Sequence, residues 1–164
     1  MPKAHSGNNE LRQKTSAHDG CAPGTPNPIN QSTKHYVRLI ETNTTGFVDV
    51  FATDGTLLRH DALHGPLHSP WGIAQAPADF GPMSNAILIS NNISRGRVNA
   101  FDPKSGGFLG PLRDANGNPI EIDNVWALQF GQDGGPNGAH IQLFFTGGPN
   151  GYANGIFGVI TFGQ

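Results

Sequence analysis

This chain repeats short stretches of its own sequence at intervals of about 50 residues. Residues 46–51 read GFVDVF and residues 96–101 read GRVNAF, and a shorter echo, GIFGVI, occupies residues 155–160. A second motif, SPWGIA at residues 69–74, is matched by NVWALQ at residues 124–129. Repeats of this length that consist only of short strand-like segments are typical of β-propeller blades. The repeat therefore predicts an all-β chain.

The composition agrees with strands joined by turns. Glycine and proline contribute 23 and 13 of the 164 residues, whereas charged residues make up only 13%, about half the usual share. Apolar residues between turn signals predict strands in three successive units, of which the middle one, Pro70 to Arg113, is a complete four-stranded blade. The predicted strands are residues 35–41, 46–51 and 56–59; residues 71–75, 86–91, 97–101 and 107–112; and residues 125–130, 141–146 and 155–161.

These strands amount to a partial β-propeller of about two and a half four-stranded blades over residues 35–164. A propeller closes at about four to eight blades, because each blade buries its faces only against its neighbours. We therefore expect the chain to be a fragment, a truncated gene product, or a protomer that completes a ring by self-association.

Residues 1–34 have a different composition. Beyond Met1 their only large apolar side chains are Leu11 and Ile29, so they cannot bury enough apolar surface to offset the entropy of ordering, and we predict that they are disordered. They lack the apolar centre of a signal peptide, and the chain has no apolar run long enough to span a membrane. A net charge of −2 gives no basic stripe for nucleic acid.

The blade motifs resemble a family of uncharacterised bacterial β-propeller proteins related to the NHL repeat. The resemblance rests on residues 46–51 with Asp54-Gly55, residues 69–74, residues 96–102 and residues 114–120, in this order. It covers about residues 46–161 and corresponds to the C-terminal portion of such a protein. It implies NHL-like blades of a six-bladed propeller and an exported, extracytoplasmic protein. The family has no established catalytic residues to carry over.

Trp71 and Trp126 occupy matching places in the second motif. Two interpretations are open. Aromatic side chains near a channel mouth can stack on a sugar or another flat ligand, whereas a tryptophan that recurs at matching positions also suits a wedge between neighbouring blades. The wedge is the interpretation that repetition favours.

Two segments carry candidate metal ligands. His60, His64 and His68 would share one face of a helix and could bind zinc, but Gly65-Pro66 interrupts that helix, so we read a loop with solvated histidines. Asp114, Asn116 and Asn118 have the alternating oxygens of a calcium loop. That loop lacks the glycine and the bidentate glutamate of a calcium-binding EF-hand, and Asn116-Gly117 favours a tight turn instead.

No catalytic residue and no cofactor are predicted. Ser69, Ser90 and Ser94 lack a Gly-x-Ser-x-Gly elbow, and the glycine-rich residues 131–138 lack the Lys-Ser/Thr ending of a phosphate loop. We expect a non-catalytic binding or scaffold module that presents loops to a protein or glycan partner. The alternatives are a propeller hydrolase or lyase with a metal in its central channel, and a nonfunctional remnant of a longer gene.

Overall fold

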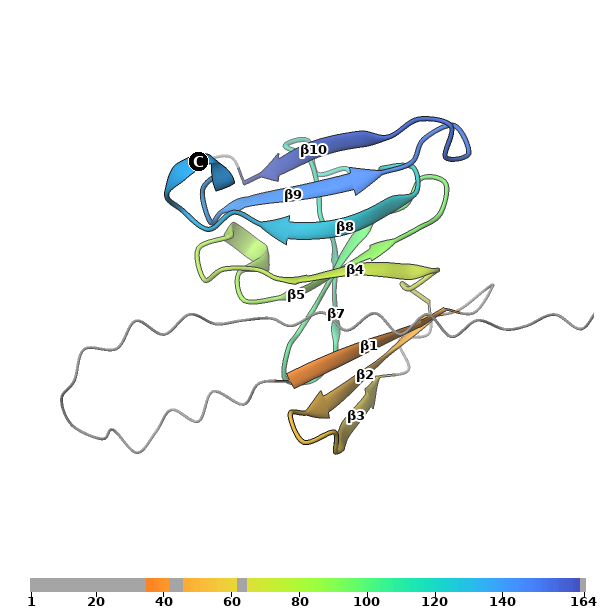
Figure 1. The fold of residues 1–164 in the computed structure, drawn as a ribbon, viewed down its shortest axis with the longest axis vertical. Coiled ribbons are helices and arrows are strands. Elements are labelled where there is room, and N and C mark those ends of the chain that lie inside the picture. Colours follow the sequence, from red (N-terminus) through yellow and green to blue (C-terminus); the bar gives the residue numbers. More distant parts are fainter. Residues whose placement is uncertain (1–34, 42–45, 62–64, 163–164) are drawn as a thin grey trace, which may run out of the picture.

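The computed structural model describes residues 35–41, 46–61 and 65–162. They form ten strands in three antiparallel sheets that lie one above another (Figure 1). The strands are β1 (His35–Glu41), β2 (Gly46–Ala52), β3 (Leu57–Asp61), β4 (Pro70–Gln75), β5 (Ile87–Asn91), β6 (Val98–Phe101), β7 (Phe108–Pro111), β8 (Val125–Phe130), β9 (Gln142–Gly147) and β10 (Ile156–Thr161). The sheets have the orders β1-β2-β3, β4-β5-β6-β7 and β10-β9-β8.

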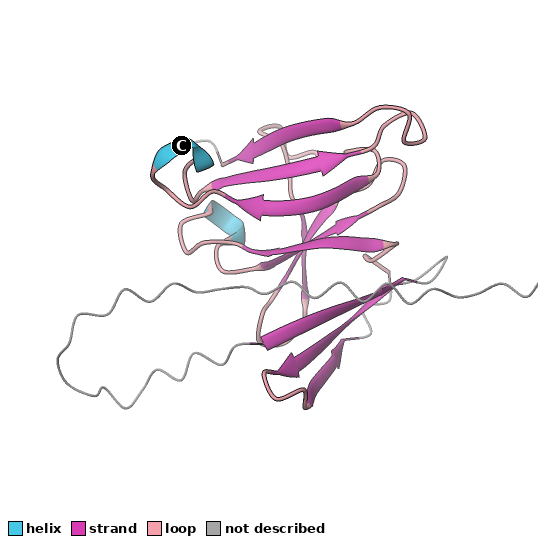
Figure 2. Ribbon diagram, in the orientation of Figure 1, coloured by secondary structure: helices cyan, strands magenta, loops and turns pink. Residues whose placement is uncertain are grey.

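The all-β prediction is confirmed. Within the described ranges the helices are two single 3₁₀ turns, η1 (Gly81–Met83) and η2 (Gly135–Asn137), and no helix is long and apolar enough to cross a membrane (Figure 2). The predicted four-stranded antiparallel unit coincides with the β4–β7 sheet. The sheets are open, and the described residues form no closed barrel or propeller ring. Residues 1–34, for which we predicted disorder, lie outside the described residues.

The β4–β7 sheet is packed on both faces. Successive β5 residues point in opposite directions, so that Leu88 joins the core toward the β8–β10 sheet and Ile89 joins the core toward the β1–β3 sheet. Both side chains are almost fully buried. The first core contains Ala74, Ala76, Phe80, Ala86, Leu88, Val98, Ala100, Leu112, Ile122, Val125, Leu128 and Leu143, and the second contains Val48, Leu67, Ile89 and Phe101. A strand that is covered on both faces carries consecutive apolar residues, as β5 does from Ile87 to Ile89.

Strands β4 and β8 approach each other at backbone distance. A Cβ atom on Gly72 would collide with the carbonyl oxygen of Trp126, so only glycine fits there. Beside it, the fully buried Ser90 hydroxyl accepts a hydrogen bond from the Gly72 amide at 2.7 Å and donates one to the Trp126 carbonyl at 2.7 Å. A single side chain of β5 therefore connects the two sheets.

The sheets share irregularities at matching sequence positions. The pairing of β2 with β3 shifts between Val50 and Phe51, and the pairing of β6 with β7 shifts between Ala100 and Phe101. These are the corresponding residues of the GFVDVF and GRVNAF motifs. Each shift marks a β-bulge, which bends and twists a hairpin. The two hairpins thus have a bulge at matching places.

The starts of β4 and β8 also correspond. Ser69 and Asn124, the residues before these strands, both adopt left-handed backbone angles, with φ of 47° and 48°. Such angles are uncommon for residues other than glycine. In both strands the register of pairing with the next strand shifts just after this residue. The shift lies between Pro70 and Ile73 in β4 and between Val125 and Leu128 in β8.

Candidate functional site

Trp126 forms an aromatic pair that the sequence analysis did not foresee. Its ring stacks on Tyr152, with ring centroids 5.7 Å apart and planes inclined by 1°. Gly148 lies against both rings, since a Cβ atom there would come within 2.7 Å of Tyr152 and 2.8 Å of Trp126. Tyr152 is 55% exposed, and its hydroxyl lies 3.4 Å from the Asn92 Oδ1 atom. We call Trp126 and Tyr152 the aromatic platform.

Trp71 has a different setting. It follows the first residue of β4 as Trp126 follows that of β8, and it is 36% exposed. Ile73, two residues further along β4, is half-buried against the core between the β1–β3 and β4–β7 sheets. Trp71 therefore keeps a solvent-facing surface, unlike a tryptophan wedged between two sheets.

A cleft of about 730 Å³ lies beside the platform, between the outer part of the β4–β7 sheet and the connections on either side of it. Three of the ten lysine and arginine residues of the chain line it, namely Arg95, Arg97 and Arg113. Glu121 and Phe108 also contribute to the lining. We call this hollow the arginine cleft. Its formal charge is positive because three guanidinium groups face one carboxylate.

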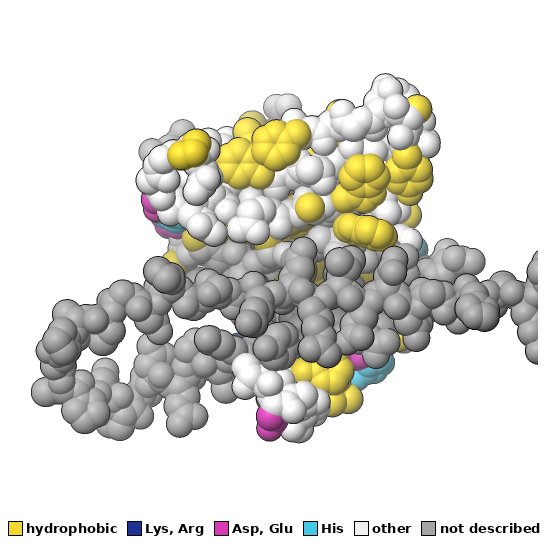
Figure 3. All heavy atoms as spheres, in the orientation of Figure 1, with side chains coloured by type: hydrophobic (Ala, Val, Ile, Leu, Met, Phe, Trp, Pro, Cys, Tyr) yellow, Lys and Arg dark blue, Asp and Glu magenta, His cyan; other side chains and the backbone are white. Residues whose placement is uncertain are grey.

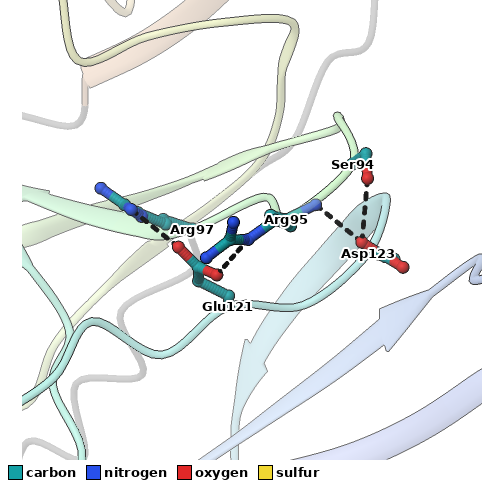
Figure 4. Close-up of polar contacts among 5 residues, drawn as sticks. All are labelled: Ser94, Arg95, Arg97, Glu121 and Asp123. Carbon is teal, nitrogen blue, oxygen red and sulfur yellow. Dashed lines mark hydrogen bonds and ion pairs between the residues drawn. The ribbon is translucent and has the colours of Figure 1, made fainter.

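Glu121 holds two of the three guanidinium groups (Figure 4). Its Oε2 atom accepts a hydrogen bond from Arg95 Nε at 2.6 Å, and its Oε1 atom accepts one from Arg97 at 2.7 Å. Hydrogen bonds from Arg97 and then Arg95 hold the pKa of the Glu121 carboxyl below its ordinary value. Beside them, Asp123 Oδ1 accepts a hydrogen bond from the Arg95 backbone amide at 2.6 Å and one from the Ser94 hydroxyl at 3.3 Å.

Two buried asparagines fix the opposite wall of the cleft. Asn91 and Asn99 each donate a side-chain hydrogen bond to the Pro66 carbonyl, at 2.8 and 2.7 Å. Asn91 also accepts a hydrogen bond from the His68 amide at 3.1 Å. Because buried amides need partners, these bonds hold the connection before β4 against the sheet. The cleft is thus a built feature of the fold.

The Asp114 loop is a turn. Asp114 Oδ1 accepts backbone hydrogen bonds from Asn116 at 2.9 Å and Asn118 at 2.8 Å, and the Asn118 bond is the main cause of its lowered pKa. Arg113 pairs with Pro119 across the turn and donates a hydrogen bond to the Gly117 carbonyl at 2.6 Å. Of the three candidate calcium ligands, Asn116 and Asn118 thus both bond to the Asp114 carboxylate, as in the tight turn that the sequence favoured.

The histidine segment differs from the predicted loop. His60 lies in strand β3, where it pairs with the buried Asp49 and packs on the Phe47 ring at a centroid distance of 5.0 Å. His68 lines the arginine cleft, and His64 lies outside the described residues. In the described part of the chain, no three His, Cys, Asp or Glu side chains are grouped so that they could hold a metal ion.

His140 connects two sheets at the other end of the molecule. Its Nδ1 atom lies 2.6 Å from Asp133, in the β8–β9 connection, and its Nε2 atom lies 2.8 Å from Asp79, in the β4–β5 connection. Hydrogen bonds with Asp79 and then Asp133 raise the pKa of the imidazole above its ordinary value. No sequence pattern indicates this bridge, because Asp79 lies 61 residues from His140 in the chain.

Comparison with known proteins places the chain beside viral sequences. No family model matches it, and no solved structure matches it. It is similar to three uncharacterized proteins of Acanthamoeba polyphaga mimivirus. Protein R648 is 33% identical over 116 residues, which are 70% of this chain and 27% of R648. Protein L690 is 36% identical over 83 residues (51% of this chain, 22% of L690), and R640 is 31% identical over 80 residues (49% and 15%).

These relatives correct one expectation. The assignment to a bacterial NHL-like propeller family is wrong, because the relatives are viral and no family model matches. The bacterial origin and the export that followed from that assignment lose their basis. The matched segment covers about a quarter or less of each relative. The chain is thus similar to a minor part of three longer viral proteins whose names assign no activity.

Proposed function

We propose that this chain is part of a non-catalytic binding module whose partner is a glycan, held on the aromatic platform. The observation that carries the proposal is the stacked pair formed by the half-buried Trp126 and the 55% exposed Tyr152. Aromatic faces pack against the apolar C–H faces of sugar rings, while the polar edges of the same side chains bond to sugar hydroxyls. The Tyr152 hydroxyl and the Asn92 amide supply such polar groups at the rim of the platform.

The platform is held rigidly, which lowers the entropic cost of binding. Gly148 packs closely against the two rings, and the Tyr152 amide donates a hydrogen bond to the Gly148 carbonyl at 3.2 Å. The Trp126 carbonyl is bound by the buried Ser90 hydroxyl at 2.7 Å. Both rings therefore come from backbone segments that are fixed by hydrogen bonds before any ligand arrives.

The proposal extends to the architecture: the three sheets are successive blade-like units of a propeller. Supporting it, β1 contacts β4 and β5 contacts β8, so each sheet lies against the next through comparable strands. The Gly46 amide donates a hydrogen bond to the Leu67 carbonyl at 3.1 Å, and between the matching residues the Ile122 amide donates one to the Gly96 carbonyl at 2.8 Å. The segment matched in R648 is 27% of that protein, which leaves length for further units.

Binding to immobilised neutral oligosaccharides tests the glycan proposal. We expect the purified chain to bind at least one neutral oligosaccharide, and Trp126→Ala to abolish that binding. The chain has two tryptophans, Trp71 and Trp126. The Trp71→Phe variant therefore leaves Trp126 as the sole indole, and its fluorescence should change as the oligosaccharide saturates the protein.

The matched control is Phe157→Ala, because Phe157 is an aromatic side chain that is 73% exposed in another strand, β10. It should bind as the wild type does. Binding that survives Trp126→Ala, or an array on which no neutral oligosaccharide is bound, would overturn the proposal. Thermal melts of each variant exclude unfolding as the cause of a loss.

A further inference from the structure

We infer that the ligand is an acidic glycan, whose anionic group enters the arginine cleft while a neighbouring sugar ring lies on the aromatic platform. This inference rests on the proposed glycan function and adds the charge of the ligand. The chemistry shared by the candidate ligands is a carboxylate or a sulfate on a sugar. Both present oxygens in a plane or a fork that a guanidinium group can bind through two parallel N–H donors.

The first argument is the concentration of charge. The chain as a whole has a net charge of −2, yet Arg95, Arg97 and Arg113 line one cleft against the single carboxylate of Glu121. The Glu121 side chain is 23% exposed, whereas those of Arg95 and Arg97 are 78% and 45% exposed. The carboxylate therefore lies deeper than the two guanidinium groups that it orients, and those groups retain N–H donors for a ligand.

The second argument is that the cleft departs from the repeat. Arg97 takes the place that Phe47 has in the preceding motif, where Phe47 packs on His60. The fold does not require a charged residue at this position, because β2, which corresponds to β6, forms with Phe47 there. A charge that is specific to one unit suits a site better than a structural repeat.

The third argument is position. Asn92 lies against the Tyr152 hydroxyl of the platform, and the next residue, Ile93, lines the cleft. Consecutive Cα atoms are about 3.8 Å apart, so the platform and the cleft adjoin across a single residue. Arg95 follows in the same turn, and its backbone is fixed by Asp123 (Figure 4). One oligosaccharide can therefore reach both surfaces.

Matched pairs of oligosaccharides test the inference. Trigalacturonate is compared with its methyl ester, which removes the charge and keeps the sugars, and 6-sulfated N-acetyllactosamine is compared with the unsulfated sugar. We expect the acidic member of at least one pair to bind about tenfold more tightly at low salt, the range of one charge-assisted pair. The preference should shrink as salt is added, because the cleft is open to solvent. The two pairs distinguish a carboxylate from a sulfate ligand.

Arg97→Gln and Arg113→Gln should each reduce the preference for the acidic member and leave binding of the neutral member unchanged. Lys104→Gln is the matched control, since Lys104 is an exposed cation in the β6–β7 turn and does not line the cleft. Equal binding of the acidic and neutral members, or a preference that persists in the double arginine variant, would overturn the inference and leave the platform proposal intact. If Trp126→Ala binds neither the acidic nor the neutral oligosaccharide, that result supports the platform proposal and does not bear on the charge of the ligand.

Discussion

Strands β6 and β10 have similar apolar composition and opposite environments. All four residues of β6 are buried, whereas β10 alternates between exposed and half-buried residues, with Phe157 73% and Val159 46% exposed. The difference lies in the neighbours. Strand β6 belongs to a sheet that has another sheet on each face, and β10 is the outer strand of the β8–β10 sheet. Figure 3 shows hydrophobic side chains on the visible surface of that sheet.

The composition of a strand therefore does not determine its burial. Position in the stack of sheets does, because an apolar face is buried only where a second layer covers it. The exposed β10 residues are then apolar surface that is available for another layer. We propose that this surface and the free edge of β10 make the isolated chain self-associate, which a closed ring would prevent.

The largest expected effect is a difference in the free energy of unfolding between a substitution in the buried β5 and one in the exposed β10. Leu88→Ala, in the core between them, should lower the free energy of unfolding by about 3 kcal/mol, because a fully buried leucine leaves a cavity. Val159→Ala, in β10, should change it by less than about 0.5 kcal/mol. Urea denaturation of both variants measures the difference. Equal costs would show that β10 is as well packed as β5.

The next effect concerns the link between the sheets. Ser90→Ala removes the hydroxyl that binds Gly72 and Trp126, and it should cost about 1–3 kcal/mol because buried polar partners are left unsatisfied. Ser94→Ala is the matched control, since its hydroxyl makes one exposed bond of 3.3 Å to Asp123. We expect it to change the free energy of unfolding by less than about 0.5 kcal/mol. A cost for Ser90→Ala within that range would contradict the proposed link.

The sequence predicted the strands because each is a short apolar run between turn residues. The observed bounds of β4 and β8, for example, agree with the predicted residues 71–75 and 125–130 to within one residue. It misplaced His60 in a loop, because the paired Asp49 on the neighbouring strand gives no local signal.

The candidate site was predicted only in part. Trp126 was singled out by its repeat, but Tyr152 lies in a loop with no periodic pattern, and its φ of 69° comes from tertiary structure. Arg95 and Glu121 are brought together by the pairing of Gly96 with Ile122, which a one-dimensional pattern does not reveal. The replacement of Phe47 by Arg97 between the two motifs was the available signal. A departure from a repeat is therefore more informative about a site than the repeat itself.

A smaller effect on stability, with a clear effect on assembly, is expected at β10. Phe157→Ser removes the most exposed aromatic side chain among the residues whose burial the structure describes, and it should leave the free energy of unfolding within about 0.5 kcal/mol of the wild type. It should shift the chain toward monomer in sedimentation velocity experiments. Phe108→Ser, at a 49% exposed position in β7, tests whether any exposed phenylalanine acts in the same way. If the wild-type chain is already a monomer that unfolds cooperatively, the proposed self-association is wrong.

The smallest effect is a pH dependence of the His140 bridge between the two sheets. Both imidazole nitrogens can donate only when the ring is protonated, and they face Asp133 and Asp79. The folded pKa of His140 is raised above 6.5, so its contribution to stability is full below 6.5 and is lost as pH rises through the folded pKa. The pKa of Asp133 is lowered from 3.8, chiefly by the His140 backbone amide, so its contribution is lost as pH falls through that lower value.

The bridge should therefore stabilise the chain most between pH 3.8 and 6.5. Because all three side chains are exposed to solvent, the effect is small and weakens with salt. The thermal midpoints of the wild type and His140→Gln, measured from pH 5 to pH 9, should converge as pH rises. The midpoint of Asp79→Asn should also approach that of the wild type as pH rises, from a smaller initial difference. Parallel profiles for the wild type and His140→Gln would show that the two sheets are held together without this ion pair.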